Sequence, residues 1–166
     1  MKKLLKISSI LAIVSGLALT IGGIWGVCFT YQSIVRENIV TPADASIPGK
    51  SVRGPLTLMA QAEVIRKHTL DITGDKTFAE MPRQIPQTDE EGEPVLDVEG
   101  KPIMIANTAR DIWITATTLT TALHLGIFAY ILSGLVILFG IILIDAGLLI
   151  YFYFPSGDNC KYPRGL

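Results

Sequence analysis

Uncharged, apolar residues gather at the two ends of this chain, and polar residues gather in the middle. From residue 7 to residue 32 no side chain is charged. From residue 112 to residue 157 the only ionisable side chains besides tyrosines are His124 and Asp145. The remaining charge lies almost entirely between Arg36 and Asp111. This pattern predicts a membrane protein with one polar domain outside the bilayer.

The first apolar run, residues 7–31, predicts a transmembrane helix. At ~1.5 Å per residue it is ~37 Å long, which exceeds the ~30 Å thickness of a bilayer core. A cleaved signal peptide is the alternative, because Lys2, Lys3 and Lys6 precede the run. The run is longer than a usual ~7–15-residue signal core, and no small-x-small site ends it. We therefore expect the helix to be retained.

The second apolar run, residues 112–154, is too long for one crossing and just long enough for two. Its first part is rich in threonine, and its most apolar part is residues 125–144. No Gly-Pro or Asn-Gly turn divides it. We therefore expect one helix, capped at its start by Asn107, that forms a stalk outside the membrane before it crosses.

Basic residues flank both runs and predict the orientation of the chain. Lys2, Lys3 and Lys6 favour a cytoplasmic N-terminus, and Lys161 with Arg164 favours a cytoplasmic C-terminus. One crossing at each end satisfies both flanks. The expected boundaries are cytoplasmic residues 1–6, a transmembrane helix at 7–31, an extracytoplasmic domain at 32–106, an extracytoplasmic helical stalk at 107–124, a transmembrane helix at 125–150, and a cytoplasmic tail at 151–166.

The polar domain opens with a predicted helix between Gly54-Pro55 and Gly74. Proline is tolerated in the first turn of a helix, and glycine is favoured just after the last turn. The side chains of Leu58, Ala62, Ile65 and Thr69 fall on one face of this helix. The domain has few apolar residues, so this face must pack on a neighbour. We expect the neighbour to be the stalk, through Trp113, Ile114 and Leu119.

Two further elements are expected in the domain. Thr77 followed by Glu80 has the spacing of a capping box and predicts a short second helix, with Pro82 and Pro86 closing the region. The acidic stretch 87–101 predicts a solvated β-hairpin or a mobile loop. A calcium-binding loop is the sharper alternative, but the spacing of the carboxylates does not match an EF-hand. The expected fold class is therefore a mainly α membrane protein with a small α-rich extracytoplasmic domain.

The segment 54–68 reads GPLTLMAQAEVIRKH, and the segment 74–80 reads GDKTFAE. With the two terminal apolar helices, this pattern resembles an uncharacterised family of bacterial, mainly actinobacterial, membrane proteins. The resemblance covers the layout of nearly the whole chain, but its motif covers only residues 37–80. It implies a bacterial plasma-membrane protein with no established activity. The acidic stretch 84–105 is longer than in that family, which leaves room for an added contact surface.

Members of that family often bear the label of an aromatic ring-opening dioxygenase subunit, and the residues here do not support that chemistry. A non-haem iron site needs two histidines and a carboxylate. This chain has only His68 and His124, and no His-x-His or Glu-x-x-His spacing joins them. No Walker, Rossmann, nucleophile-elbow or zinc spacing occurs. We expect no enzyme activity, no cofactor and no metal site.

Net charge and the positions of the cysteines exclude two further features, nucleic-acid binding and a disulfide within one chain. The net charge is −1, with no basic stripe, so nucleic acid is not an expected partner. The two cysteines, Cys28 and Cys160, fall at opposite ends of the membrane in the expected topology, so they cannot pair within one chain.

The leading hypothesis is an accessory or scaffolding subunit that binds the lipid bilayer and either another membrane protein or a second copy of itself. A small oligomeric transport or channel component is the alternative. Asp145 is a candidate contact because a carboxylate is costly among apolar neighbours. It lies only nine residues before Phe154, ~14 Å along a helix and near the inner interface, where burial costs less, so a plain interface residue is the alternative. Gly22 and Gly26 have the spacing of a close helix contact, with Gly16, Thr20, Ala129 and Ser133 nearby on similar faces. The full set of candidate partner contacts is Gly22, Gly26, Pro55, His68, Lys76, Phe78 and Asp145.

Overall fold

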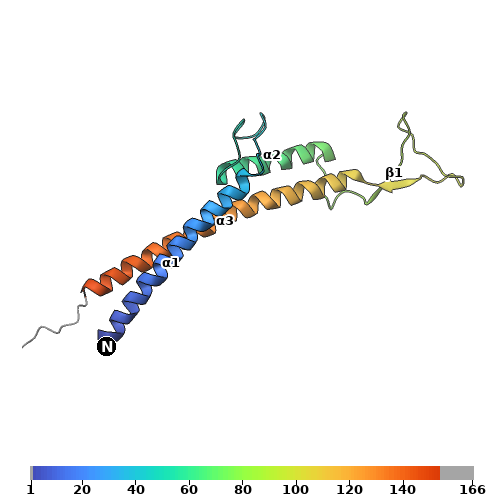
Figure 1. Cartoon of the computed structure of the whole chain (residues 1–166). Coiled ribbons are helices and arrows are strands. Elements are labelled where there is room, and N and C mark those ends of the chain that lie inside the picture. Colours follow the sequence, from blue (N-terminus) through green and yellow to red (C-terminus); the bar gives the residue numbers. More distant parts are fainter. Residues whose placement is uncertain (1, 154–166) are drawn as a thin grey trace, which may run out of the picture. The chain divides into compact units, whose positions relative to one another are not determined.

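The computed structural model describes residues 2–153, which contain three helices and one two-stranded antiparallel sheet (Figure 1). The elements in chain order are α1 (Lys2–Val35), α2 (Pro55–Thr73), β1 (Gln84–Pro86), β2 (Met104–Ala106) and α3 (Thr108–Tyr153). Cys160, Lys161 and Arg164, which entered the disulfide and orientation arguments, lie outside the described residues.

The first and last helices are long and apolar enough to cross a membrane, over Lys3–Val35 and Thr108–Tyr153. Only 11% of the most apolar window of the first helix and 6% of that of the second are buried inside the protein. The central helix of a soluble domain is enclosed by other elements, whereas most of the apolar surface of these two helices is not covered by the protein.

The last helix is continuous over 46 residues. At ~1.5 Å per residue it is ~69 Å long, more than twice the ~30 Å of a bilayer core. The prediction of one long helix in place of a helical hairpin is therefore confirmed. The described chain divides into two compact units, which are the helix pair (residues 2–33 and 128–153) and the polar unit (residues 34–127).

The boundaries predicted for α2 are confirmed. Pro55 occupies the first turn, after the cap residue Gly54. At the other end Gly74 has φ +62°, and its N–H bonds the carbonyl of Leu70, which closes the helix in the left-handed conformation that glycine adopts most readily. The expected inner face is correct, since Leu58, Ala62 and Thr69 are buried and Ile65 is half-buried.

The helix α2 packs along the first part of α3, the neighbour that the sequence predicted for it. Leu58 lies 3.3 Å from where a Cβ on Gly126 would stand, and the guanidinium of Arg66 lies 5.8 Å from the ring of Trp113. The expectation was wrong for Ile114 and Leu119, which are each 51% exposed. Residues three or four positions apart share a helix face, so the neighbours of Trp113 on the inner face are Ala116, Thr117 and Thr120.

The predicted second helix at Thr77 is a turn. The capping contact is present, because the carboxylate of Glu80 accepts hydrogen bonds from the backbone N–H of Thr77 at 2.7 Å and from its hydroxyl at 2.7 Å. The chain does not continue as a helix, because Pro82 has no N–H to donate and disfavours helical backbone at Met81.

Residues 84–106, which include the acidic stretch, form three short arms. We call this segment the three-arm module. Its first arm is the β1–β2 ladder, in which Pro86 pairs with Met104. The other two arms are tight turns closed by the pairs Thr88 with Pro94 and Leu96 with Pro102. The sequence predicted one hairpin or a loop, and the structure has three antiparallel arms that meet at one point.

A ring of three backbone hydrogen bonds forms that junction. The N–H of Gln87 donates to the carbonyl of Ile103 at 2.7 Å, that of Ile103 to Val95 at 2.8 Å, and that of Val95 to Gln87 at 2.8 Å. These three residues are spaced eight apart, and each follows a proline. The module therefore has local threefold repetition, although its residues bury almost nothing: in the arms only Ile85 and Val95 are half-buried.

Candidate functional site

The helix pair is held together by small residues spaced seven apart. On α1 these are Ser9, Gly16, Gly23 and Thr30, all buried; on α3 they are Ser133, Gly140 and Gly147, of which the two glycines are buried. A seven-residue repeat keeps one seam of a helix against its partner in a left-handed supercoil, and small side chains let the two backbones approach closely.

The closeness of this approach is measured by what an added methyl group would meet. A Cβ on Gly16 would lie 2.5 Å from the carbonyl oxygen of Gly140, and a Cβ on Gly140 would lie 2.7 Å from that of Gly16. At the end of the pair nearest the N-terminus, the hydroxyl of Ser9 donates to the carbonyl of Gly147 at 2.6 Å. The helices are therefore antiparallel partners along this seam.

The Gly22-x-x-x-Gly26 spacing does not describe this seam. A Cβ on Gly26 would lie 2.6 Å from the hydroxyl of Ser133, so this glycine faces α3. Gly22 is exposed, and a Cβ added there would meet no other part of the described chain within 4 Å. Its close-contact role within the chain is excluded, and a contact with a separate molecule stays a prediction.

Asp145 lies on the outside of the helix pair. Its side chain is exposed, and the surrounding positions on the same face of α3 are Ile141, Ile142, Leu148 and Leu149, which are 39–52% exposed. Among the described residues Asp145 makes no hydrogen bond or ion pair. A carboxylate thus stands alone on an apolar helix face.

His68 has a defined partner in the polar unit. Its Nε2 lies 2.8 Å from the carboxylate of Asp44, which also accepts a hydrogen bond from Lys67 at 3.0 Å. The hydrogen bonds from His68 and then Lys67 lower the pKa of Asp44 from 3.8 to about 2. All three side chains are near half exposed, so this cluster is an accessible latch that ties the 41–51 loop to α2.

A second latch fixes the 77–83 segment to the start of α3. The guanidinium of Arg110 stacks on the ring of Phe78, 3.7 Å from its centroid, and donates to the carbonyls of Phe78 and Met81. Asn107 caps α3 by accepting the N–H of Ala109 at 3.1 Å, as predicted, and its amide donates to the carbonyl of Pro82 at 3.0 Å. Phe78 is therefore a packing residue.

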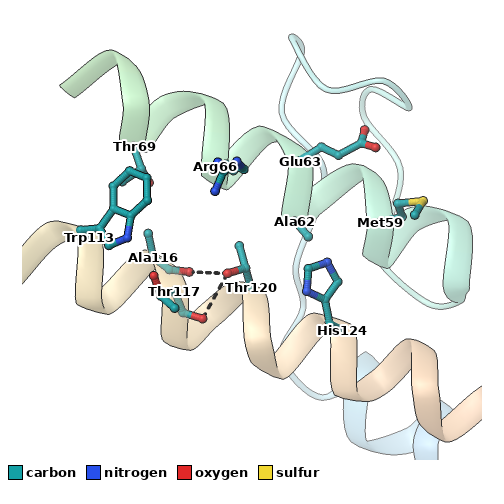
Figure 2. A pocket seen from close by; sticks show the side chains of 10 residues that line it. All are labelled: Met59, Ala62, Glu63, Arg66, Thr69, Trp113, Ala116, Thr117, Thr120 and His124. Carbon is teal, nitrogen blue, oxygen red and sulfur yellow. Dashed lines mark hydrogen bonds between the residues drawn. The ribbon is translucent and has the colours of Figure 1, made fainter. Parts of the chain in front are cut away.

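An open groove of about 190 Å³ lies between α2 and residues 113–124 of α3 (Figure 2). Its lining includes the small side chains of Ala62, Ala116 and Thr120. The hydroxyl of Thr120 donates to the carbonyls of Ala116 and Thr117, at 2.9 and 3.1 Å, so this hydroxyl is already satisfied within α3. Trp113 and Thr69 lie toward one end of the groove, and His124 and Met59 lie toward the other, as Figure 2 shows.

The remaining candidate contacts lie on the surface of the polar unit. Pro55 is exposed in the first turn of α2, and Lys76 is exposed beside the end of that helix. The carbonyl of Lys76 accepts the hydroxyl of Thr73 at 2.7 Å, which fixes its backbone and leaves its ammonium in solvent. The structure therefore distributes the predicted residues over both units and does not gather them into one pocket.

The three-arm module presents both acid and apolar side chains. Its two turns contain six carboxylate side chains and one lysine. Its large exposed apolar residues are Leu96, Val98, Ile103, Met104 and Ile105, and Val98 at the tip of the third arm is fully exposed. In each turn one aspartate accepts two backbone N–H groups, Asp89 from Glu91 and Glu93, and Asp97 from Glu99 and Lys101.

Sequence reasoning missed three features of these surfaces. The repeat Asp-x-Glu-Gly-x-Pro at 89–94 and 97–102 is visible in the sequence and marks the two turns. The seven-residue spacing of small residues on α1 and α3 is visible as well. Nothing in the sequence pairs Asp44 with His68, because the two residues are brought together by the path of the loop.

The fold is that of a mainly helical chain with two helices that can cross a membrane and one small sheet. Among residues 2–153 no group of three His, Cys, Asp or Glu side chains could hold a metal ion. No protein-family model, curated protein or solved structure matches this chain.

Proposed function

We propose that this chain is a non-enzymatic subunit of a bacterial plasma membrane, which crosses the bilayer twice and holds another membrane protein through its polar unit and its outer helix faces. Both termini are cytoplasmic in this proposal, and residues 32–124 lie outside. The resemblance of residues 37–80 to an uncharacterised bacterial membrane family, and the lysines before the first helix, support this arrangement.

The observation that carries the proposal is the exposed apolar surface of the three-arm module. An ordered segment of some twenty residues that hides almost none of its side chains gains little from folding alone. Backbone hydrogen bonds and the turn aspartates hold its shape, so its apolar side chains stay outward. Exposed apolar groups with a polar rim are typical of a surface that meets another protein.

The experiment removes the module without disturbing its base. Gln87 and Ile103 are already hydrogen-bonded at 2.7 Å, so residues 88–102 can be replaced by Asn-Gly, which favours a two-residue hairpin turn. Tagged full-length chain and this variant are purified from native membranes in mild detergent and weighed by native mass spectrometry. We expect a complex with a second protein for the full-length chain and loss of that protein for the variant.

Two results would contradict the proposal. Recovery of the full-length chain alone, as a monomer, would contradict the proposed accessory role. Ring-shaped homo-oligomers that conduct ions in liposomes would favour the channel alternative. Replacement of Glu90, Glu91 and Glu93 by glutamine is the matched control, because it removes charge from the second arm and keeps the apolar residues and both turn aspartates.

A further inference from the structure

An apolar belt surrounds Asp145 on the outward face of α3. The residues three and four positions away on this face are aliphatic and point away from α1, since the seam of the helix pair is made by Gly140, Ile144 and Gly147. In a bilayer this face meets either lipid tails or another helix. A carboxylate among aliphatic side chains at such a site is costly unless a partner compensates it.

The depth of the carboxylate follows from the positions of Lys6 and Tyr151. The ammonium of Lys6 lies 5.6 Å from the ring of Tyr151, and a lysine with a tyrosine is the usual marker of a membrane–water boundary. Asp145 is six residues before Tyr151, or ~9 Å deeper along the helix. The short side chain of aspartate cannot span that depth, whereas a lysine or arginine can reach along a helix by several ångströms.

The described part of this chain offers no cation at that depth. Gly147, two residues after Asp145, packs against Ser9 and Ile13 of α1, and the ammonium of Lys6 lies over the ring of Tyr151. A second copy would bring a second carboxylate to the same level, because the partners in a twofold dimer present the same residues. Charge complementarity therefore favours a different chain.

We propose that Asp145 binds a lysine or arginine in the transmembrane helix of a partner protein, at the level ~9 Å inside the boundary marked by Tyr151. The inference rests on the proposed two-crossing arrangement and names the chemistry of the partner. The aliphatic side chains around Asp145 form the packing surface, and the ion pair fixes the depth and rotation of the incoming helix.

The test uses a synthetic helix as the probe, so that it does not depend on recovery of the natural partner. Full-length chain with a donor dye at its N-terminus is placed in phosphatidylcholine vesicles with an acceptor-labelled leucine-alanine transmembrane peptide. One peptide has a single lysine at the depth of Asp145, and the matched peptide has leucine there. We expect the lysine peptide to associate about three- to twenty-fold more strongly, in line with measured polar contacts between membrane helices.

The variants decide the assignment. Asp145→Leu should abolish the preference for lysine, Asp145→Asn should reduce it, and Gly134→Leu, at an exposed position with no neighbour within 4 Å, should leave it unchanged. Equal association of both peptides with the unaltered chain, or a lysine preference that survives Asp145→Leu, would overturn the proposal. Displacement of the lysine peptide by unlabelled full-length chain, if it requires Asp145, would also overturn the proposal. The occupant of the site would then be a second copy. Copurification of a natural partner can fail independently of this result, so the two proposals are separable.

Discussion

The hydroxyl of Ser9 donates a 2.6 Å hydrogen bond to the carbonyl of Gly147, and this bond joins two residues that are 138 positions apart. It is possible only because Gly147 has no side chain: a Cβ there would lie 2.9 Å from the carbonyl of Ser9. The hydrogen bond and the close approach of the two backbones therefore depend on the same glycine. This contact binds the first helix to the last and closes the two apolar ends of the chain into a single unit.

The seam of the helix pair predicts which glycines tolerate a larger side chain. Leucine at Gly16 or Gly140 would meet the opposite backbone at 2.9 Å or less, so either substitution should destabilise the pair by about 1–3 kcal/mol or separate the helices. Leucine at Gly22 or Gly134 meets open space and should change the stability little. Unfolding of the purified chain in mixed detergent micelles, followed by circular dichroism, measures the difference. Equal effects of all four substitutions would refute the assigned seam.

Removal of the Ser9 hydroxyl should weaken the pair measurably but not break it. Hydrogen bonds between membrane helices contribute about 0.6 kcal/mol on average, so Ser9→Ala should lower the unfolding free energy by roughly that amount. The neighbouring Ser8 is exposed, and Ser8→Ala serves as the matched control with no expected effect. Coupling to Gly147 is tested by the double variant with Gly147→Ala, which should cost less than the sum of the two single changes.

The latch at Arg110 should control the order of the 77–83 segment. Its guanidinium makes two bonds to carbonyl oxygens and covers the Phe78 ring, and hydrogen bonds to a charged group contribute about 1.5–3 kcal/mol. Arg110→Ala should therefore increase hydrogen–deuterium exchange in this segment. Lysine at position 110 should rescue it only partly, because it lacks the planar fork. Arg83→Ala is the control, since that side chain is exposed. Unchanged exchange in Arg110→Ala would show that Asn107 alone holds the segment.

The latch at Asp44 predicts a dependence on acid pH. The folded-state pKa of Asp44 is about 2, below its ordinary value of 3.8, so the ionised form is the one that the fold favours. Its contribution is complete above pH 4 and is lost as the pH falls from about 4 toward 2. Exchange in the 41–51 loop should rise over that window.

The Asp44→Asn variant tests the same latch at constant pH. Its loop should exchange faster at neutral pH, and the step between pH 4 and 2 should disappear. An acid step of the same size in both proteins would assign it to other carboxylates, among them Glu80, whose pKa is also lowered by its hydrogen bonds to Thr77.

Hydrophobic length and local signals were enough to predict the helices. A long apolar run favours leaving water whatever its neighbours are, so the sequence alone predicts it. The Pro55 and Gly74 boundaries and the Asn107 cap are equally local, since each depends on backbone geometry within a few residues. The helix expected at Thr77 failed for a local reason too, because Pro82 follows too soon for a second turn.

The partners of these elements required the tertiary structure. The sequence shows glycines at several spacings, and the Gly22 and Gly26 pair was singled out while the seven-residue series was missed. Only the register between α1 and α3 decides which glycines face inward. In the same way, the repeat in the acidic stretch is visible in the sequence, but only one hairpin or a loop was predicted there, because the ring of hydrogen bonds among Gln87, Val95 and Ile103 depends on three separate strand segments meeting.

The sequence by itself determined that this chain has two apolar helices at its ends, one of them longer than a bilayer requires, and a polar segment between them. These properties follow from transfer free energies that add along the chain. The tertiary structure decided that Ser9 meets Gly147, that Asp44 meets His68, and that Asp145 faces outward. Those facts depend on which surfaces of two helices come together, and a rotation of either helix would change them without any change in composition.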